Sequence, residues 1–262
     1  MKKTYTPPQG LRPCATIVLL LVLSIGKVKA QTETDTSFRY QVNTIFGPLD
    51  KSKVPHGILR DYAMEFTNLE YYNGSATLAD SNQETSSVFY MVYNTLVSGR
   101  IHSSASGIVV PDTLENRWYG YRDTGRITLA GLFFNYSRFK DNAYPNYITI
   151  SSNKIYDKYV SSVWQNPYQE EKTFVISPSV TDYPALSFNV LLPANCWLTN
   201  STNAGIAINF NDGLGYRSIT TGSTVAVSYS NAGTKEWIYR LALTGGGYLY
   251  AHSYVEVSGP AY

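Results

Sequence analysis

Cysteine and histidine are scarce in this sequence. Two cysteines and three histidines occur among its 262 residues. The three histidines (His56, His102 and His252) are far apart, and no His-Glu-x-x-His pattern or cysteine cluster provides the spacing of a zinc ligand set. We therefore expect no metal site and no cofactor in this chain.

Long hydrophobic runs are also missing. The main apolar run, residues 15–23, is well short of the roughly 20 residues that a helix needs to cross a bilayer. Basic residues precede this run, and Val28 and Ala30 stand at the −3 and −1 positions before Gln31. This arrangement is typical of a secretory signal peptide. We predict a signal peptide over residues 1–30, cleavage between Ala30 and Gln31, and no membrane span after its removal. A retained membrane anchor is the alternative.

Removal of residues 1–30 changes both the charge and the cysteine count. The full chain has 21 Lys and Arg against 19 Asp and Glu, and five of the basic residues but none of the acidic ones lie in residues 1–30. The mature chain therefore has 16 basic against 19 acidic residues, a net charge of −3. This balance gives no support to nucleic-acid binding. Cys196 remains alone, so it cannot form an internal disulfide, and we expect it to be a buried thiol.

The sequence also lacks a recognisable catalytic pattern. No Gly-x-Ser-x-Gly occurs, and Ser104-Ala-Ser-Gly107 is the nearest approach to such a nucleophile turn. His102 with Ser104 and Asp112 is the arrangement that a hydrolase would need, but closeness in sequence is no sign of a triad. Glu170 and Glu171 are expected to face opposite sides of a strand. We predict no catalytic residues and no enzyme activity.

One helix is clearly indicated, over residues 83–98. Apolar residues recur there at helical spacing, and Gly99 supplies a stop signal. Ser81 with Glu84 matches a capping box at its start. Residues 100–111 are expected to form a loop around a short strand over residues 107–110.

Strands dominate the rest. Runs of β-branched or aromatic residues predict strands over residues 126–139, 147–151, 154–160 and 172–176. After Pro184 the breaks become regular and predict strands over residues 185–192, 205–210, 224–228, 237–243 and 248–257. We expect a mostly β protein, with an N-terminal α+β module over residues 31–180 and an immunoglobulin-like β-sandwich over residues 184–262.

The last third carries a resemblance to a known family. Ile208-Asn-Phe-Asn-Asp-Gly213 is followed by Val227-Ser-Tyr-Ser-Asn-Ala-Gly-Thr234 and Ile238-Tyr-Arg-Leu-Ala-Leu243. In this order and spacing, residues 184–258 resemble a PKD-like, immunoglobulin-type domain of extracellular proteins. Asp212-Gly213 is expected to form a turn with positive φ. Tyr229 is expected to fix a corner through its hydroxyl.

A second resemblance covers the whole mature chain. Val54-Pro-His-Gly-Ile-Leu-Arg-Asp-Tyr62, followed by Phe66-Thr-Asn-Leu69 and Tyr72-Asn-Gly74, is similar to the opening region of long secreted cell-surface proteins of Bacteroidetes. In those proteins this region precedes other domains. The resemblance implies that the chain is a truncated or partial member whose effector domain is missing.

Aromatic residues provide the remaining functional lead. Tyrosine occurs 23 times, and aromatics make up 14% of the chain. The densest group contains Trp118, Tyr119 and Tyr121, whose rings and polar groups suit contact with a cell-surface glycan or protein. An ordinary role in half-buried structure is the alternative for these side chains.

Together these features predict a secreted or cell-surface structural or presentation module. A carbohydrate-binding module that uses the aromatic group is one alternative. The leader region of a secreted hydrolase whose catalytic domain is missing is another.

Overall fold

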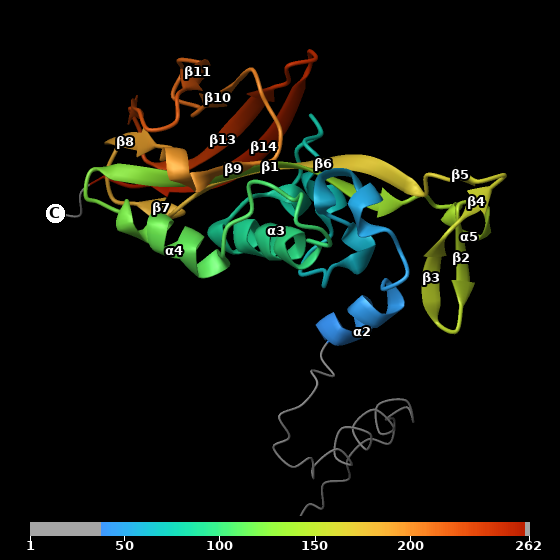
Figure 1. Cartoon of the computed structure of the whole chain (residues 1–262). Coiled ribbons are helices and arrows are strands. Elements are labelled where there is room, and N and C mark those ends of the chain that lie inside the picture. The colour runs from blue at the N-terminus through green and yellow to red at the C-terminus, as the bar shows by residue number, and fades with distance from the viewer. Residues whose placement is uncertain (1–37, 260–262) are drawn as a thin grey trace, which may run out of the picture. The chain divides into compact units, whose positions relative to one another are not determined.

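The computed structural model describes residues 38–259 (Figure 1). Its contacts divide the chain into two compact units, Met1–Asn43 and Thr44–Tyr262, and the described strands all lie in the second. The predicted signal peptide, its cleavage site between Ala30 and Gln31, and Cys14 lie outside the described residues. Strands make up 39% and helices 24% of the described residues, so the protein is mostly β.

The helices lie mainly in the first half of the chain. The α-helices are α2 (Phe38–Ile45), α3 (Ser86–Ser98), α4 (Pro111–Gly120) and α5 (Ala143–Asn146). Short 3-10 turns are η1 (Lys51–Lys53), η2 (Pro55–Gly57), η3 (Arg60–Tyr62), η4 (Leu69–Tyr72), η5 (Asp80–Asn82) and η6 (Ala194–Cys196). No helix of the described part is long and apolar enough to cross a membrane.

Strand β1 (Arg126–Phe139) is the centre of the first sheet, whose main path is β12-β8-β1-β6. It pairs antiparallel with β6 (Tyr168–Pro178) on one edge. Its other edge pairs in parallel with β8 (Ser187–Leu191) near its start and with β9 (Trp197–Thr199) near its middle. β12 (Thr224–Ser228) pairs antiparallel with β8.

The second sheet has the order β11-β10-β13-β14-β7. Its centre is the long antiparallel pair of β13 (Gly233–Ala242) and β14 (Tyr248–Val257). β10 (Gly205–Asn209) pairs with β13, and β11 (Tyr216–Ile219) pairs with β10 at the edge. β7 (Asp182–Tyr183) pairs in parallel with the end of β14.

The two sheets share one apolar core. Alternate residues of β13 point into it: Trp237, Tyr239 and Leu241 are buried, while Ile238 and Arg240 are half-buried on the other side. The first sheet contributes Ile127, Leu129, Phe133, Phe174, Ile176 and Val190 to the same cluster. Each such side chain stabilises the fold by about 1.5–3 kcal/mol when fully removed from water.

A second apolar cluster covers the other face of β1 and β6. Helices α3 and α4 lie against this face, opposite the second sheet (Figure 1). Leu132 and Phe134 of β1 pack there against Phe89 and Leu96 of α3 and Trp118 of α4. Because both faces of β1 are covered, its sequence is almost continuously apolar instead of alternating.

Helix α3 confirms the predicted helix except at its start. It begins at Ser86, and its N-cap is Thr85, whose side chain accepts a hydrogen bond from the Val88 amide. The expected capping box of Ser81 and Glu84 was wrong. Glu84 is instead buried, with 2% of its surface exposed, and its carboxyl oxygen accepts a hydrogen bond from the Ile176 amide of β6 at 2.8 Å. Burial against β6, and not the local capping pattern, therefore determines where the Glu84 side chain lies.

Several predicted strands are confirmed closely, and two are not. β1, β12 and β14 have the predicted bounds. The predicted run over residues 154–160 is divided between two hairpins, β2 (Ile148–Ser151) with β3 (Lys154–Asp157) and β4 (Tyr159–Val160) with β5 (Val163–Trp164). The short strand expected over residues 107–110 was wrong, because these residues form no strand.

The predicted domain boundary falls inside one compact unit. The first sheet combines β1 and β6, from the expected N-terminal module, with β8, β9 and β12, from the expected C-terminal domain. Residues 179–184 lie inside the same unit, Thr44–Tyr262, as the strands on both sides of them.

An aromatic corner, defined here as Phe210, Tyr229 and Trp237, closes one end of the shared core. The Tyr229 hydroxyl donates to the Phe210 carbonyl at 2.7 Å and accepts from Trp237 Nε1 at 2.8 Å. The Phe210 and Trp237 rings meet edge to face, with centroids 5.0 Å apart. Burial raises the pKa of Tyr229 to about 12. Tyr229 therefore fixes the connection through its hydroxyl, as its sequence context predicts.

Candidate functional site

The structure separates the three aromatic residues singled out in the sequence. Trp118 is buried, with 3% of its surface exposed, and its Nε1 donates to the Thr128 carbonyl at 3.1 Å. Tyr119 is 65% exposed. Tyr121 is half-buried and caps the C-terminal end of α4. These residues therefore do not form one aromatic surface.

Helix α4, which the sequence analysis missed, explains this separation. Successive residues of a helix point in directions about 100° apart, so Trp118 and Tyr119 cannot share a face. Leu114 and Trp118 are separated by one helical turn, and both are buried. Pro111 in the first turn was an available start signal. Together with the Leu114–Trp118 spacing, it could have identified Trp118 as a core residue.

A small pocket lies beside Trp118 and Tyr119. Its volume is about 70 Å³, and its other lining residues are Ser86, Tyr90, Glu115 and Arg122. A water molecule occupies about 30 Å³, and pockets for small organic ligands start near about 300 Å³. This pocket has room for water and does not enclose a sugar ring.

The three histidines each contact a nearby polar group. His56 Nε2 lies 3.0 Å from a Glu170 oxygen. His252 is buried, with its Nδ1 2.8 Å from a Glu236 oxygen and its Nε2 2.9 Å from the Ala79 carbonyl. Through these contacts His252 joins β14 to the segment before α3.

His102 and Ser104 form a close pair within one turn. His102 Nδ1 lies 2.8 Å from Ser104 Oγ and also accepts a hydrogen bond from the Ser104 amide at 3.1 Å. Both contacts use the same ring nitrogen. Within residues 38–259, no carboxylate, Asp112 included, forms a hydrogen bond or ion pair with His102. The pair thus lacks the acidic residue that orients the histidine in a triad.

The thiol of Cys196 is buried among apolar side chains. Burial raises its pKa to about 11. A thiol with a raised pKa is protonated at neutral pH and is a poor nucleophile. The prediction of a buried thiol is confirmed.

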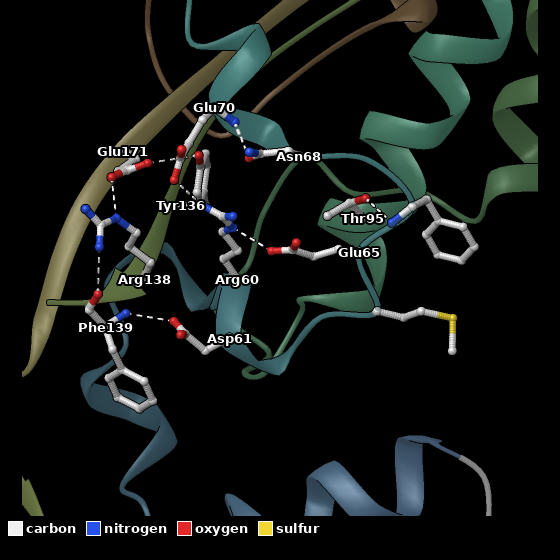
Figure 2. A network of polar contacts seen from close by, with 12 residues as sticks. Arg60, Asp61, Glu65, Asn68, Glu70, Thr95, Tyr136, Arg138, Phe139 and Glu171 are labelled. Atoms are coloured by element: carbon white, nitrogen blue, oxygen red, sulfur yellow. Dashed lines mark hydrogen bonds and ion pairs between the residues drawn. The ribbon is translucent and has the colours of Figure 1, made fainter. Parts of the chain in front are cut away.

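An extensive polar arrangement, which we call the ion network, contains two arginines that each pair with two carboxylates; Figure 2 labels all of these residues except Asp141. Its members are Arg60, Glu65, Glu70, Arg138, Asp141 and Glu171. Arg60 donates from Nε to Glu65 and from Nη1 to Glu70, both at 2.5 Å. Arg138 of β1 donates from Nε to Glu171 of β6 at 2.5 Å and from Nη1 to Asp141 at 2.6 Å. The Arg60 pairs lie within residues 60–70, and the Arg138 pairs lie on β1, β6 and the residues just after β1. The neighbouring Asp61 carboxylate, which accepts the Phe139 amide, connects the two parts.

The protonation of the network follows from its contacts. The hydrogen bond from Arg60 holds the pKa of Glu70 below its usual range. Hydrogen bonds to Glu171 and Asp141 raise the pKa of Arg138. The neighbouring Asp61 behaves differently: burial raises its pKa, although its carboxylate accepts the Phe139 amide at 2.7 Å. Glu70 and Arg138 are therefore charged at neutral pH.

A cleft of about 440 Å³ opens over this network. It is lined by Arg60, Asp61, Glu65, Glu70, Arg138, Phe139, Lys140 and Asp141. The arginines are already paired with carboxylates, so they are not available to an anionic ligand. No group of three or more His, Cys, Asp or Glu side chains in the described part of the chain is arranged to hold a metal ion. The network is best understood as a structural cross-link.

Neither a family model nor a curated protein sequence matches this chain. The PKD-like resemblance of residues 184–258 and the resemblance of the whole chain to secreted Bacteroidetes proteins stay predictions.

Proposed function

We propose that this chain is a secreted or cell-surface structural module that spaces or presents other parts of an extracellular protein, without catalysis of its own. In this proposal residues 184–262 provide a PKD-like, immunoglobulin-type β-sandwich, and residues 31–180, which include β1 and β6, form an N-terminal α+β module. The signal peptide pattern of residues 1–30 supports the extracellular location.

One observation carries the proposal: the side chains best suited to chemistry are occupied by structural contacts. His252 bridges Glu236 and the Ala79 carbonyl, Cys196 is a buried thiol with a raised pKa, and the arginines of the ion network are paired with carboxylates. A catalytic group must instead reach the reacting atoms of a substrate. A rigid body with its polar groups internally paired suits spacing and presentation.

Export is tested by expressing the full chain in a secreting bacterial host and measuring the mass of the released protein. We expect a mature N-terminus at Gln31 and loss of release when residues 2–30 are deleted. A released protein that retains Met1, or retention in the membrane fraction, would contradict the proposal.

Absence of catalysis is tested at the His102–Ser104 pair, the arrangement nearest to a nucleophile and its base. The mature protein and its Ser104→Ala variant are assayed on activated esters and on peptide and glycoside substrates. We expect equal background rates for both proteins. Turnover that disappears in Ser104→Ala would overturn the non-catalytic role.

A further inference from the structure

The outer face of the second sheet carries a group of tyrosines around one arginine. Register places Arg240 of β13 opposite Tyr250 of β14 and the neighbouring Ala242 opposite Tyr248. Tyr216 of β11 belongs to the same outer face, because it pairs with Asn209, which pairs with Ile238 two residues before Arg240. We call Tyr216, Arg240, Tyr248 and Tyr250 the tyrosine–arginine face.

Two rings hold the guanidinium of Arg240. Its Cζ lies 4.1 Å from the ring centroid of Tyr216 and 4.6 Å from that of Tyr248. The Tyr248 and Tyr250 rings are neighbours, with centroids 6.4 Å apart. Stacking between aromatic faces restricts a guanidinium without using its N–H donors. The cation is therefore oriented before any ligand arrives.

Arg240 differs from the other half-buried arginines of the sheets. Arg126, Arg138 and Arg217 each pair with a carboxylate. Within residues 38–259, the Arg240 side chain has neither a hydrogen bond nor an ion pair, and two tyrosine rings contact its charge. Five N–H donors in a fixed planar group thus lack an acceptor, and a carboxylate is the ligand that fits them best.

The surroundings of Arg240 are open. Tyr248 is 51% and Tyr216 37% exposed. The nearest positions on β10 and β13 have small side chains, since Ala207 pairs with Arg240 and Gly205 pairs with Ala242. A Cβ atom added at Gly205 would meet nothing within 4 Å. A flat ligand can therefore lie across the rings without displacing a side chain.

We propose that the tyrosine–arginine face binds an acidic saccharide, with the carboxylate of a uronic acid on Arg240 and the sugar rings on Tyr216 and Tyr248. A pyranose ring combines an apolar C–H face, which suits an aromatic ring, with hydroxyls that suit tyrosine hydroxyls. Two exposed rings beside one cation favour this ligand over an acidic peptide, for which further cations would be expected. The site lies outside the Trp118 helix and goes beyond the proposed structural role without depending on it.

The test measures binding of the mature protein to oligogalacturonate by titration calorimetry in 150 mM salt, where weak long-range attraction is screened. Neutral galactan oligomers and polyglutamate are the comparison probes. We expect binding to oligogalacturonate that weakens at least about tenfold in Arg240→Ala, because a charge-assisted bidentate contact is lost. Tyr248→Ala should weaken binding by a similar factor, while Tyr248→Phe, which keeps the ring, should weaken it less.

Arg122→Ala is the matched control. The Arg122 guanidinium also lies over a tyrosine ring, that of Tyr119, at 4.5 Å from Cζ to centroid, but it lies just after α4 and far in sequence from the second sheet. We expect this variant to bind as the unchanged protein does, and the melting temperatures of all variants verify that they are folded. The proposal is overturned if oligogalacturonate does not bind, if binding survives Arg240→Ala, or if polyglutamate binds equally well. Loss of binding in Arg122→Ala alone would instead place the glycan site at the Trp118 helix.

Discussion

The aromatic corner and the ion network each hold several segments of the chain together, but they do so by different physical means. The corner joins residues 210, 229 and 237 through neutral hydrogen bonds inside the apolar core. The ion network pairs charges within residues 60–70 and, through Arg138, between β1 and β6, and its outer carboxylates are exposed, with Glu70 at 52% and Asp141 at 89%. Salt and pH act on the second kind of contact and hardly on the first.

The difference shows where stability resides in this fold. A buried neutral hydrogen bond is costly to break because it leaves unsatisfied groups away from water. Breaking an exposed ion pair costs little stability, because water solvates the group that has lost its partner. We therefore expect the second sheet and its corner to contribute more to stability than the more numerous charged contacts at the far end of β1.

The largest effect is expected from Trp237→Ala, which empties the centre of the corner. Trp237 is fully buried, so the loss of its contacts and the resulting cavity should lower the free energy of unfolding by about 3–5 kcal/mol. Urea denaturation measures the change. Leu214→Ala, at a side chain that is 68% exposed, should change stability by less than about 0.5 kcal/mol. If Trp237→Ala and Leu214→Ala lowered the free energy of unfolding by similar amounts, the aromatic corner would not be a main source of stability.

Tyr229→Phe separates the hydrogen bonds of the corner from its packing. It removes the hydroxyl that contacts both the Phe210 carbonyl and Trp237 Nε1, and leaves these two groups unsatisfied. We expect a loss of about 1–3 kcal/mol that is the same in low and high salt. Tyr119→Phe, at an exposed ring, is the control. A loss that shrinks strongly in 1 M salt would contradict a neutral corner.

The Glu84→Gln variant tests whether the charge of the buried Glu84 carboxyl lowers the free energy of unfolding at neutral pH. Burial holds the pKa of Glu84 well above its usual range, so the folded state keeps this proton more tightly than the unfolded chain does. The stability that this carboxyl contributes is therefore full below about pH 4 and is lost as the pH rises. Glutamine retains an acceptor for the Ile176 amide but has no charge to bury.

We expect Glu84→Gln to raise the free energy of unfolding at pH 7 by about 1–3 kcal/mol, and this gain to vanish near pH 4. Denaturation curves at both pH values measure it. Glu115→Gln, at an exposed position on α4, should change neither curve. A destabilised Glu84→Gln protein at pH 7 would mean that the ionised carboxylate has a favourable role.

The smallest effect is expected from Arg138→Gln in the ion network. Arg138 and Glu171 are each only 19% exposed, so the loss should lie near the upper end for surface pairs, about 1 kcal/mol. It should shrink when the salt concentration rises from 0.05 to 1 M, because screening weakens the original pair. Arg122→Gln provides an exposed arginine as control. A loss of stability as large as that of Tyr229→Phe would show that the ion network contributes as much to stability as the aromatic corner does.

The strands were largely predictable because their signals are local. β1, β12 and β14 are runs of β-branched or aromatic residues between clear breaks, and the sequence predicts their bounds. Their pairing was not predictable, since the parallel contact of β1 with β8 joins residues about sixty positions apart. Glu84 illustrates the same limit, because a local capping pattern gives way to burial against β6.

The candidate site was only partly predictable. The role of Tyr229 could be predicted because a hydroxyl before a Gly-Thr corner has few other partners nearby. Trp118 was misjudged because aromatic density was considered without the helical spacing that buries it. Arg240 and Tyr248 could not be paired from the sequence, since their proximity depends on the register between β13 and β14.

The pairing of β1 along both of its edges has a consequence for dividing the chain into fragments. A fragment that ends near residue 180 would retain β6 but would leave the edge of β1 that pairs with β8 and β9 bare, together with the apolar face that meets the second sheet. The complementary fragment would carry the missing strands and the matching apolar face. Two such pieces, each with an open edge, are natural candidates for reassembly in trans, so that β1 would act as the template on which a split chain recombines.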